Sequence, residues 1–135
     1  MILGVKKAIN KLMTFTPWAS NPLKKQSEDT RVFCSEIQAN EVQMNMGGRI
    51  EGSYSVVFYI TFGNNKANPT EQFYILTSET MSMFQSKVLK CFLNENFIIS
   101  KQPVFDNIGT HQDPTTGICT GTFQLNISVI QRKES

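Results

Sequence analysis

The sequence predicts an α+β fold, in which a mainly antiparallel sheet packs with an N-terminal helix and one long central helix. Two segments, 54–62 and 119–129, alternate apolar and polar residues with a period of two, which is typical of strands with one buried face. Residues 2–13 and 69–94 instead repeat apolar side chains at helical spacing. Strands and helices in this order, packed in layers, form an α+β domain.

Length and composition favour a single globular domain, 1–135. A chain of 135 residues can bury roughly two-thirds of the surface that it exposes when unfolded. Charged residues make up only 18%, and Asn, Gln, Ser and Thr are abundant, so the surface suits protein contacts better than a charge-driven partner. A net charge of +2 is too small to predict specific nucleic-acid binding. We interpret the lysines near the N-terminus as a solvated helix face and a loop: Lys6, Lys7, Lys11, Lys24 and Lys25.

The cysteines and the N-terminus predict a cytosolic location for the chain when it is made. Three cysteines, Cys34, Cys91 and Cys119, form no CxxC pair and lie in apolar patterns, so we expect reduced, buried thiols. Lys6 and Lys7 interrupt the first apolar residues, which argues against a secretory signal. No apolar run is long enough to span a bilayer, so no membrane partner is expected.

The first half of the chain is expected to run from a helix through a loop to strands. Residues 2–13 form an amphipathic helix that Pro17 stops, and docking on the domain's own sheet is favoured over a membrane surface. Residues 14–30 are expected to be an irregular loop, whose Trp18 either pins the loop to the core or anchors an interface. Residues 31–39 are moderately strand-like, with Phe33, Ile37 and Ala39 on one side and Val32 and Cys34 on the other.

A turn and a central strand follow. The pair Gly47-Gly48 predicts a turn or hairpin tip within residues 40–53. In 54–62 one face is apolar and the other, which includes Val57 and Tyr59, is partly apolar. We therefore expect a central strand with something packed on both of its sides.

The second half begins with the long helix. Asn68-Pro69-Thr70-Glu71 is a helix-start signature, and the apolar stripe that follows predicts a helix ending near 94–96. A strand over 72–77 with a shorter helix capped by Thr77 or Ser78 remains an alternative. Residues 97–99 form a short strand or helix exit, 101–117 a strand end with a turn-rich segment, and 131–135 a charged, frayed tail.

Candidate catalytic and metal-binding residues are few. The one histidine, His111, lies between Asp106 and Asp113 in a predicted loop, and these residue types can bind a metal, but their spacing matches no site. Cys119 is near His111 in sequence but belongs to the apolar face of its strand. We therefore expect no enzyme, no catalytic residue, no cofactor and no metal, although a hydrolase or metal enzyme built around His111 is an alternative.

Four segments of this layout are distinctive together: the strand 52–62 (GSYSVVFYITF), the helix end 87–93 (KVLKCFL), the segment 102–109 (QPVFDNIG) and the closing strand 121–129 (GTFQLNISV). In this order they resemble tail terminator proteins of long-tailed bacteriophages, which are also called minor capsid or head-tail joining proteins. The resemblance covers residues 1–13 and 50–130, whereas the loop 14–30 and the tip 44–52 depart from it.

The resemblance implies a structural virion protein, made in the host cytoplasm, whose copies form a six-membered ring. The ring caps the tail tube and offers its other side to the head connector protein, and DNA passes through it without specific binding. The alternatives are another phage assembly protein, such as a tail tube or head-completion subunit, and a non-viral small binding module. We expect the contact residues in the loops and on the polar face of the last strand: Trp18, Met44, Met46, Arg49, Asp106, His111, Asp113, Thr122, Gln124 and Asn126.

Overall fold

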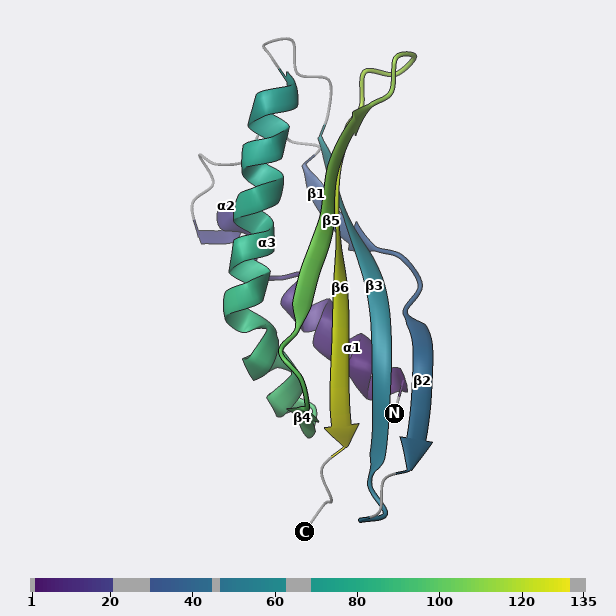
Figure 1. Cartoon of the computed structure of the whole chain (residues 1–135). Helices are drawn as coiled ribbons and strands as arrows, with labels where there is room; N and C mark the ends of the chain where they lie inside the picture. Colours follow the sequence, from purple (N-terminus) through teal and green to yellow (C-terminus); the bar gives the residue numbers. More distant parts are fainter. Residues whose placement is uncertain (1, 21–29, 45–46, 63–68, 132–135) are drawn as a thin grey trace.

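The computed structural model confirms the α+β class, and it describes residues 2–20, 30–44, 47–62 and 69–131 (Figure 1). The elements in chain order are α1 (Ile2–Leu12), α2 (Pro17–Ser20), β1 (Arg31–Cys34), β2 (Gln38–Met44), β3 (Ile50–Phe62), α3 (Pro69–Asn94), β4 (Phe97–Ile99), β5 (Val104–Gln112) and β6 (Cys119–Gln131).

The sheet is built around one long antiparallel pair, β3 and β6. Their register runs from Glu51 opposite Ile130 to Phe62 opposite Cys119. β1 and β2 both pair with the free side of β3, and β4 and β5 both pair with the free side of β6, always antiparallel. The sheet is thus four strands wide. One edge is formed by β1 and β2, one after the other along β3, and the other edge is formed by β4 and β5 along β6.

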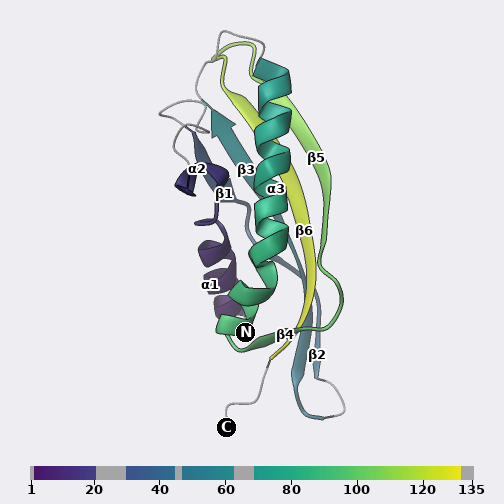
Figure 2. The ribbon, with the colours of Figure 1, turned by 90° about the vertical axis from the view of Figure 1, so that its left-hand side faces the viewer.

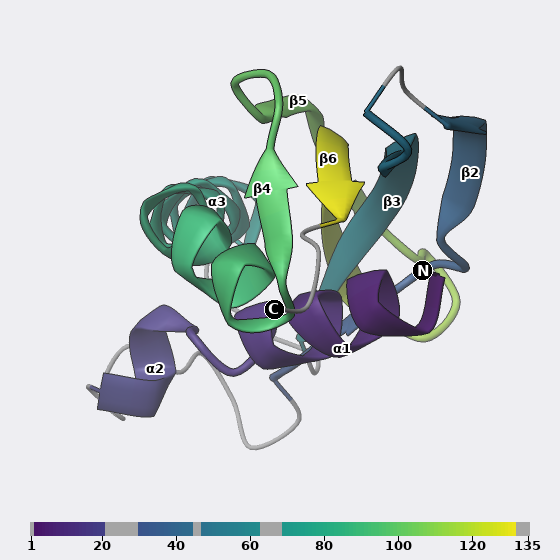
Figure 3. The same cartoon turned by 90° about the horizontal axis from the view of Figure 1, so that it is seen from below.

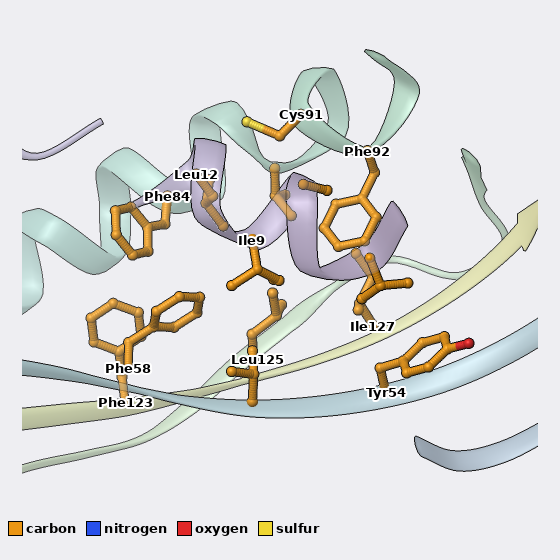
Figure 4. Close-up of a cluster of buried hydrophobic side chains, with 14 of the residues drawn as sticks. Ile9, Leu12, Tyr54, Phe58, Phe84, Cys91, Phe92, Phe123, Leu125 and Ile127 are labelled. Atoms are coloured by element: carbon orange, nitrogen blue, oxygen red, sulfur yellow. The ribbon is translucent and has the colours of Figure 1, made fainter. Parts of the chain in front are cut away.

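Both long helices cover the same face of this sheet (Figures 2 and 3). Residues of β3 and β6 alternate between buried and half-buried positions, as the period of two predicts. In the core, Phe58 of β3, Phe84 of α3 and Phe123 of β6 contact one another, with ring centroids 5.0 to 5.6 Å apart (Figure 4). A fully buried side chain of this size contributes about 1.5–3 kcal/mol as an upper estimate, so these rings tie all three elements together.

The segment 69–94 forms one helix, α3, which settles the alternative of a strand followed by a shorter helix. Its core-facing side confirms the predicted stripe, since Leu76, Phe84 and Val88 are buried. Asn96 follows the helix with a φ of 64°, the left-handed conformation that commonly ends helices. The predicted cap, Asn68, lies outside the described residues.

Three predicted boundaries were wrong. Residues 31–39 do not form one strand, because Ser35 exchanges hydrogen bonds with the backbone of Val57 and the chain then leaves to begin β2. The short helix α2 lies inside the segment 14–30 that was predicted to be irregular, of which 21–29 are outside the described residues. Strand β5 occupies nine residues of a segment that was predicted to be mostly turns. The predicted charged tail, 131–135, is described only at Gln131, which ends β6.

The expectation that β3 is covered on both sides was also wrong for the described part of the chain. Its second face stays half-exposed, because α1 and α3 both lie on the first face. The partly apolar character of that second face has a local cause. Tyr59 stacks on Phe33 of the neighbouring strand β1, with ring centroids 5.2 Å apart.

The closest approach of α3 to the sheet lies at Thr77 and Gly121. Thr77 is fully buried, and its hydroxyl has no hydrogen-bond partner within the described residues. It points at Gly121 of β6, where a Cβ atom would overlap that hydroxyl and lie 3.0 Å from the Cβ atom of Thr77. Glycine at 121 therefore sets how closely the helix packs on the sheet.

We predict that Gly121→Ala lowers the free energy of unfolding by about 1–3 kcal/mol, because the added methyl group overpacks this contact. Thr77→Ala combined with Gly121→Ala should recover part of the loss, since it removes the overlapping hydroxyl. Urea denaturation of the single and double variants measures both effects. Gly109→Ala is the matched control, because its Cβ would lie 3.5 Å from Thr122, an ordinary contact. An equal loss in both glycine variants would contradict the proposed contact.

Candidate functional site

The face of the sheet opposite α1 and α3 is not covered by any described helix. We call it the open face. Cross-strand partners share a face of a sheet, so the register assigns its members from all six strands. They are Arg31 and Phe33 from β1; Gln38, Glu41 and Gln43 from β2; Glu51, Ser53, Ser55, Val57, Tyr59 and Thr61 from β3; Ile98 from β4; Val104, Asp106, Gly109 and His111 from β5; and Thr120, Thr122, Gln124, Asn126, Ser128 and Ile130 from β6.

Uncharged polar side chains connect across the open face by hydrogen bonds. Asn40 at the start of β2 donates to Ser55 Oγ at 2.7 Å, and Ser55 donates to Asn126 Oδ1 at 2.8 Å. At the cross-strand pair two residues further along β3 and β6, the hydroxyl groups of Ser53 and Ser128 are 3.0 Å apart. We call this set the polar ladder. It crosses from β2 through β3 to β6, so each side chain holds its neighbour in place.

Asn126 is the hub of the polar ladder. Its Oδ1 atom also accepts from Gln124 Nε2 at 3.0 Å, and its Nδ2 atom lies 3.5 Å from Asp106 Oδ1. Asn107 extends the network from β5 by donating to Gln124 Oε1 at 3.2 Å. Asn107 has a φ of 55° and sits in a register shift between Asp106 and Gly109, so a β-bulge turns its side chain towards β6.

The open face also carries an apolar area at one end. Phe33 and Tyr59 stack with an interplanar angle of 13°, and Phe33 remains 47% exposed. Charges of both signs also lie on this face or beside it: Arg31 on β1, Glu41 on β2, Glu51 on β3, Asp106 on β5, and Lys101 in the link between β4 and β5. A face that mixes uncharged polar groups, charges of both signs and an apolar area at one end suits contact with protein better than binding of a charged small molecule.

The structure brings together half of the predicted contact residues. Asp106, His111, Thr122, Gln124 and Asn126 all belong to the open face. Met44, which ends β2 with 71% exposure, and Arg49, directly before β3, lie at the opposite end of the sheet from the turn between β5 and β6 (Figure 1). Met46 lies outside the described residues. Trp18 on α2 is half-buried against the core, as expected of a side chain that pins its segment.

Asp113 organises the turn between β5 and β6. Its Oδ1 atom accepts from the backbone N–H of Thr115 at 2.8 Å and of Thr116 at 3.3 Å. These hydrogen bonds, helped by the nearby His111, lower the pKa of the Asp113 carboxyl below its usual value. The carboxylate therefore stabilises the backbone conformation of this exposed turn.

The thiols are held in their protonated form. Cys91 and Cys119 are buried and Cys34 is half-buried, and all three are free. Burial raises the pKa of each thiol, which disfavours the nucleophilic thiolate. Within the described ranges no group of three His, Cys, Asp or Glu side chains is close enough to hold a metal ion.

Sequence reasoning missed the contribution of the neighbouring strands to this surface. No local sequence pattern points to Ser53 or Asn40, because their hydrogen bonds depend on the register between strands. Ser55 and Tyr59 had a signal, since the alternation in 54–62 places them opposite the core. Pairing with β6 is what turns that alternation into one continuous surface.

Comparison with models of known protein families and with curated protein sequences finds no match to this chain. Among the described helices, none is long and apolar enough to cross a membrane.

We predict that Asn126→Ala lowers the free energy of unfolding by about 0.5–1.5 kcal/mol, because three side chains lose a hydrogen-bond partner at once. Thermal and urea denaturation measure this loss. Thr122→Ala is the control, because Thr122 lies on the same strand and face but makes no side-chain hydrogen bond within the described residues. If Thr122→Ala were the more destabilising variant, the polar ladder would not contribute as described.

We predict that the turn at Asp113 loosens in acid. A carboxyl whose pKa is lowered in the folded state stabilises the fold above its unfolded pKa, and that contribution is lost as the pH falls through the lowered folded value. Amide hydrogen exchange at Thr115 and Thr116 should therefore accelerate below about pH 4, relative to the amides of β6. Asp113→Asn should remove this pH dependence, and an unchanged acid response in that variant would contradict the assignment.

Proposed function

We propose that the chain is a structural virion subunit, a phage tail terminator whose copies form a ring between the tail tube and the head connector. One observation carries the proposal most strongly: the sheet ends in two open edges and leaves one face uncovered. The resemblance of segments 52–62, 87–93, 102–109 and 121–129 to tail terminators supplies the identity of the ring. The described residues also provide no activated nucleophile and no metal cluster on which to base an enzyme.

The two edges of the sheet are suited to one another. β1 and β2 run antiparallel to β3, whereas β4 and β5 run antiparallel to β6 and therefore parallel to β3. A copy rotated about an axis along the strands would place its β1 and β2 edge antiparallel to the β4 and β5 edge of the next copy. Such a head-to-tail interface uses two different surfaces, and it closes into a ring when the rotation closes.

Strand β2 is the most exposed part of these edges. All seven of its residues are exposed, and its apolar side chains include Val42 at 52% and Met44 at 71%. Beyond the register shift between Ala39 and Glu41, the strand stays paired with β3 up to Met44, and an exposed edge of this kind can pair with another chain unless something protects it. In the proposed ring a neighbouring subunit provides that protection.

The two ends of the sheet supply the axial contacts in this proposal. The end of β2 and residues 47–49 before β3 lie at one end, and the turn that Asp113 organises lies at the other (Figure 1). A ring with its axis along the strands would therefore present one of these segments to the tail tube and the other to the head connector. The open face would lie along the inner or outer wall of the ring.

The direct test measures the mass of the purified protein, alone and mixed with tail tubes, by light scattering and native mass spectrometry. We expect a closed oligomer near six times the protomer mass, or assembly to that size on the ends of tubes. Electron microscopy of particles then gives the ring number and the axial position. A strict monomer that never associates with tubes would overturn the proposal, and a ring found elsewhere in the particle would favour another assembly role.

A charge on the β2 edge should prevent assembly. We predict that Val42→Lys leaves a folded monomer, because an edge lysine opposes pairing with a second chain. Ile75→Lys is the matched control, since Ile75 is 51% exposed on α3, away from β2. Light scattering reports the mass, and circular dichroism reports the fold. Assembly that is lost equally in both variants would show that the edge is not the contact.

A further inference from the structure

The helix layer gathers positive charge that the small net charge of the chain conceals. Lys7 and Lys11 are one turn apart on α1, and Lys87 and Lys90 are one turn apart on α3. The two helices contact each other and lie side by side on the outer surface of the helix layer (Figure 2). We call these four side chains the lysine patch.

Phe15, which follows α1, holds the two inner members of the lysine patch together. The Nζ atom of Lys11 lies 5.8 Å from the centre of its ring, and the Nζ atom of Lys87 lies 5.4 Å from the same centre. Cation–π contacts of this length are attractive and restrict both side chains. Two ammonium groups from different helices therefore contact one aromatic ring.

The buried thiol of Cys91 lies close enough to three lysines of the patch to interact with their charges. Burial raises the pKa of Cys91, and the positive charges of Lys11, Lys90 and Lys87 act against that rise. Three ammonium groups thus lie near one point, where α1 crosses α3. The carboxylates of the helix layer whose side chains are described are Glu79, two turns before Lys87, and Glu95, beyond the end of α3.

We propose that the lysine patch binds the phosphate backbone of duplex DNA without sequence specificity. Clustered lysines supply this kind of affinity by replacing the counterions condensed on DNA. The patch has no readout group for base edges, since its members are ammonium groups, which position a backbone and do not specify sequence.

The chemistry of the patch favours nucleic acid over its two competitors. Lysine is depleted at protein–protein interfaces, whose centres are apolar, whereas this patch consists of ammonium groups around a half-buried Phe15. An anionic membrane would need a continuous apolar helix face to insert. The apolar face of α1, with Val5, Ile9 and Leu12, is already buried in the core, and the exposed leucines of this layer, Leu3, Leu89 and Leu93, are divided between two helices.

The test compares two variants with the same change of net charge. Lys7→Gln with Lys90→Gln removes the two patch lysines that make no cation–π contact with Phe15, and Lys6→Gln with Lys101→Gln removes two exposed lysines outside the patch. Fluorescence anisotropy with a short labelled duplex is measured between about 50 and 200 mM salt. The wild-type chain should show a slope of log K against log salt of about −3 to −4.

We expect the patch variant to bind about 10-fold or more weakly at the lowest salt, with a slope less negative by about 2, while the control variant binds nearly as the wild type does. Equal losses in both variants, or no binding of duplex by the wild type, would overturn the proposal. So would binding to phosphatidylserine vesicles in preference to DNA. The outcome is independent of ring formation, because a monomer can be titrated in the same way.

Discussion

The antiparallel pairing of β3 with β6 is the interaction on which the rest of the structure depends. Both strands have thirteen residues, and they remain in register from Glu51 opposite Ile130 to Phe62 opposite Cys119. Every other strand pairs with one of these two. The shared register also aligns Phe58 with Phe123, which places two large rings side by side where Phe84 of α3 packs onto them.

One-sided coverage follows from this arrangement and shapes the remaining surfaces. Because α1 and α3 bury a single face, the fold is closed on one side and open on the other. The open face does not need a second layer of helices, since the polar ladder satisfies its side chains across strands and leaves them half-exposed to water. Buried polar groups without partners are costly, whereas half-exposed groups in a network cost little. A stable subunit can thus leave this face and both edges free for neighbours.

The same layering distributes the charges of the chain unevenly. The sheet and its connections carry both signs, with Glu36, Glu41, Glu51, Asp106 and Asp113 beside Arg31, Arg49 and Lys101. Four lysines gather on the helix layer, on the opposite side of the core. A net charge of +2 describes the sum over the chain and does not reveal this local cluster. An assembly built through the sheet edges would leave the lysine patch accessible, so the two proposed contacts do not compete for one surface.

The sequence by itself determined the fold class, the helical periods of α1 and α3, and which side of each central strand is buried. Periodicity is a local property, so 54–62 and 119–129 revealed their apolar faces without any knowledge of their partners. It also placed Thr122, Gln124 and Asn126 opposite the core, on the face where the structure has them.

Only the tertiary structure decided how those faces combine. The break at Ser35, the length of β5 and the hydrogen bond from Asn40 to Ser55 depend on pairing between segments far apart in sequence. Which face of β3 the helices cover, and which lysines meet around Phe15, depend on how two layers pack. Local pattern fixes what each segment can bury, and long-range packing then selects what lies beside it.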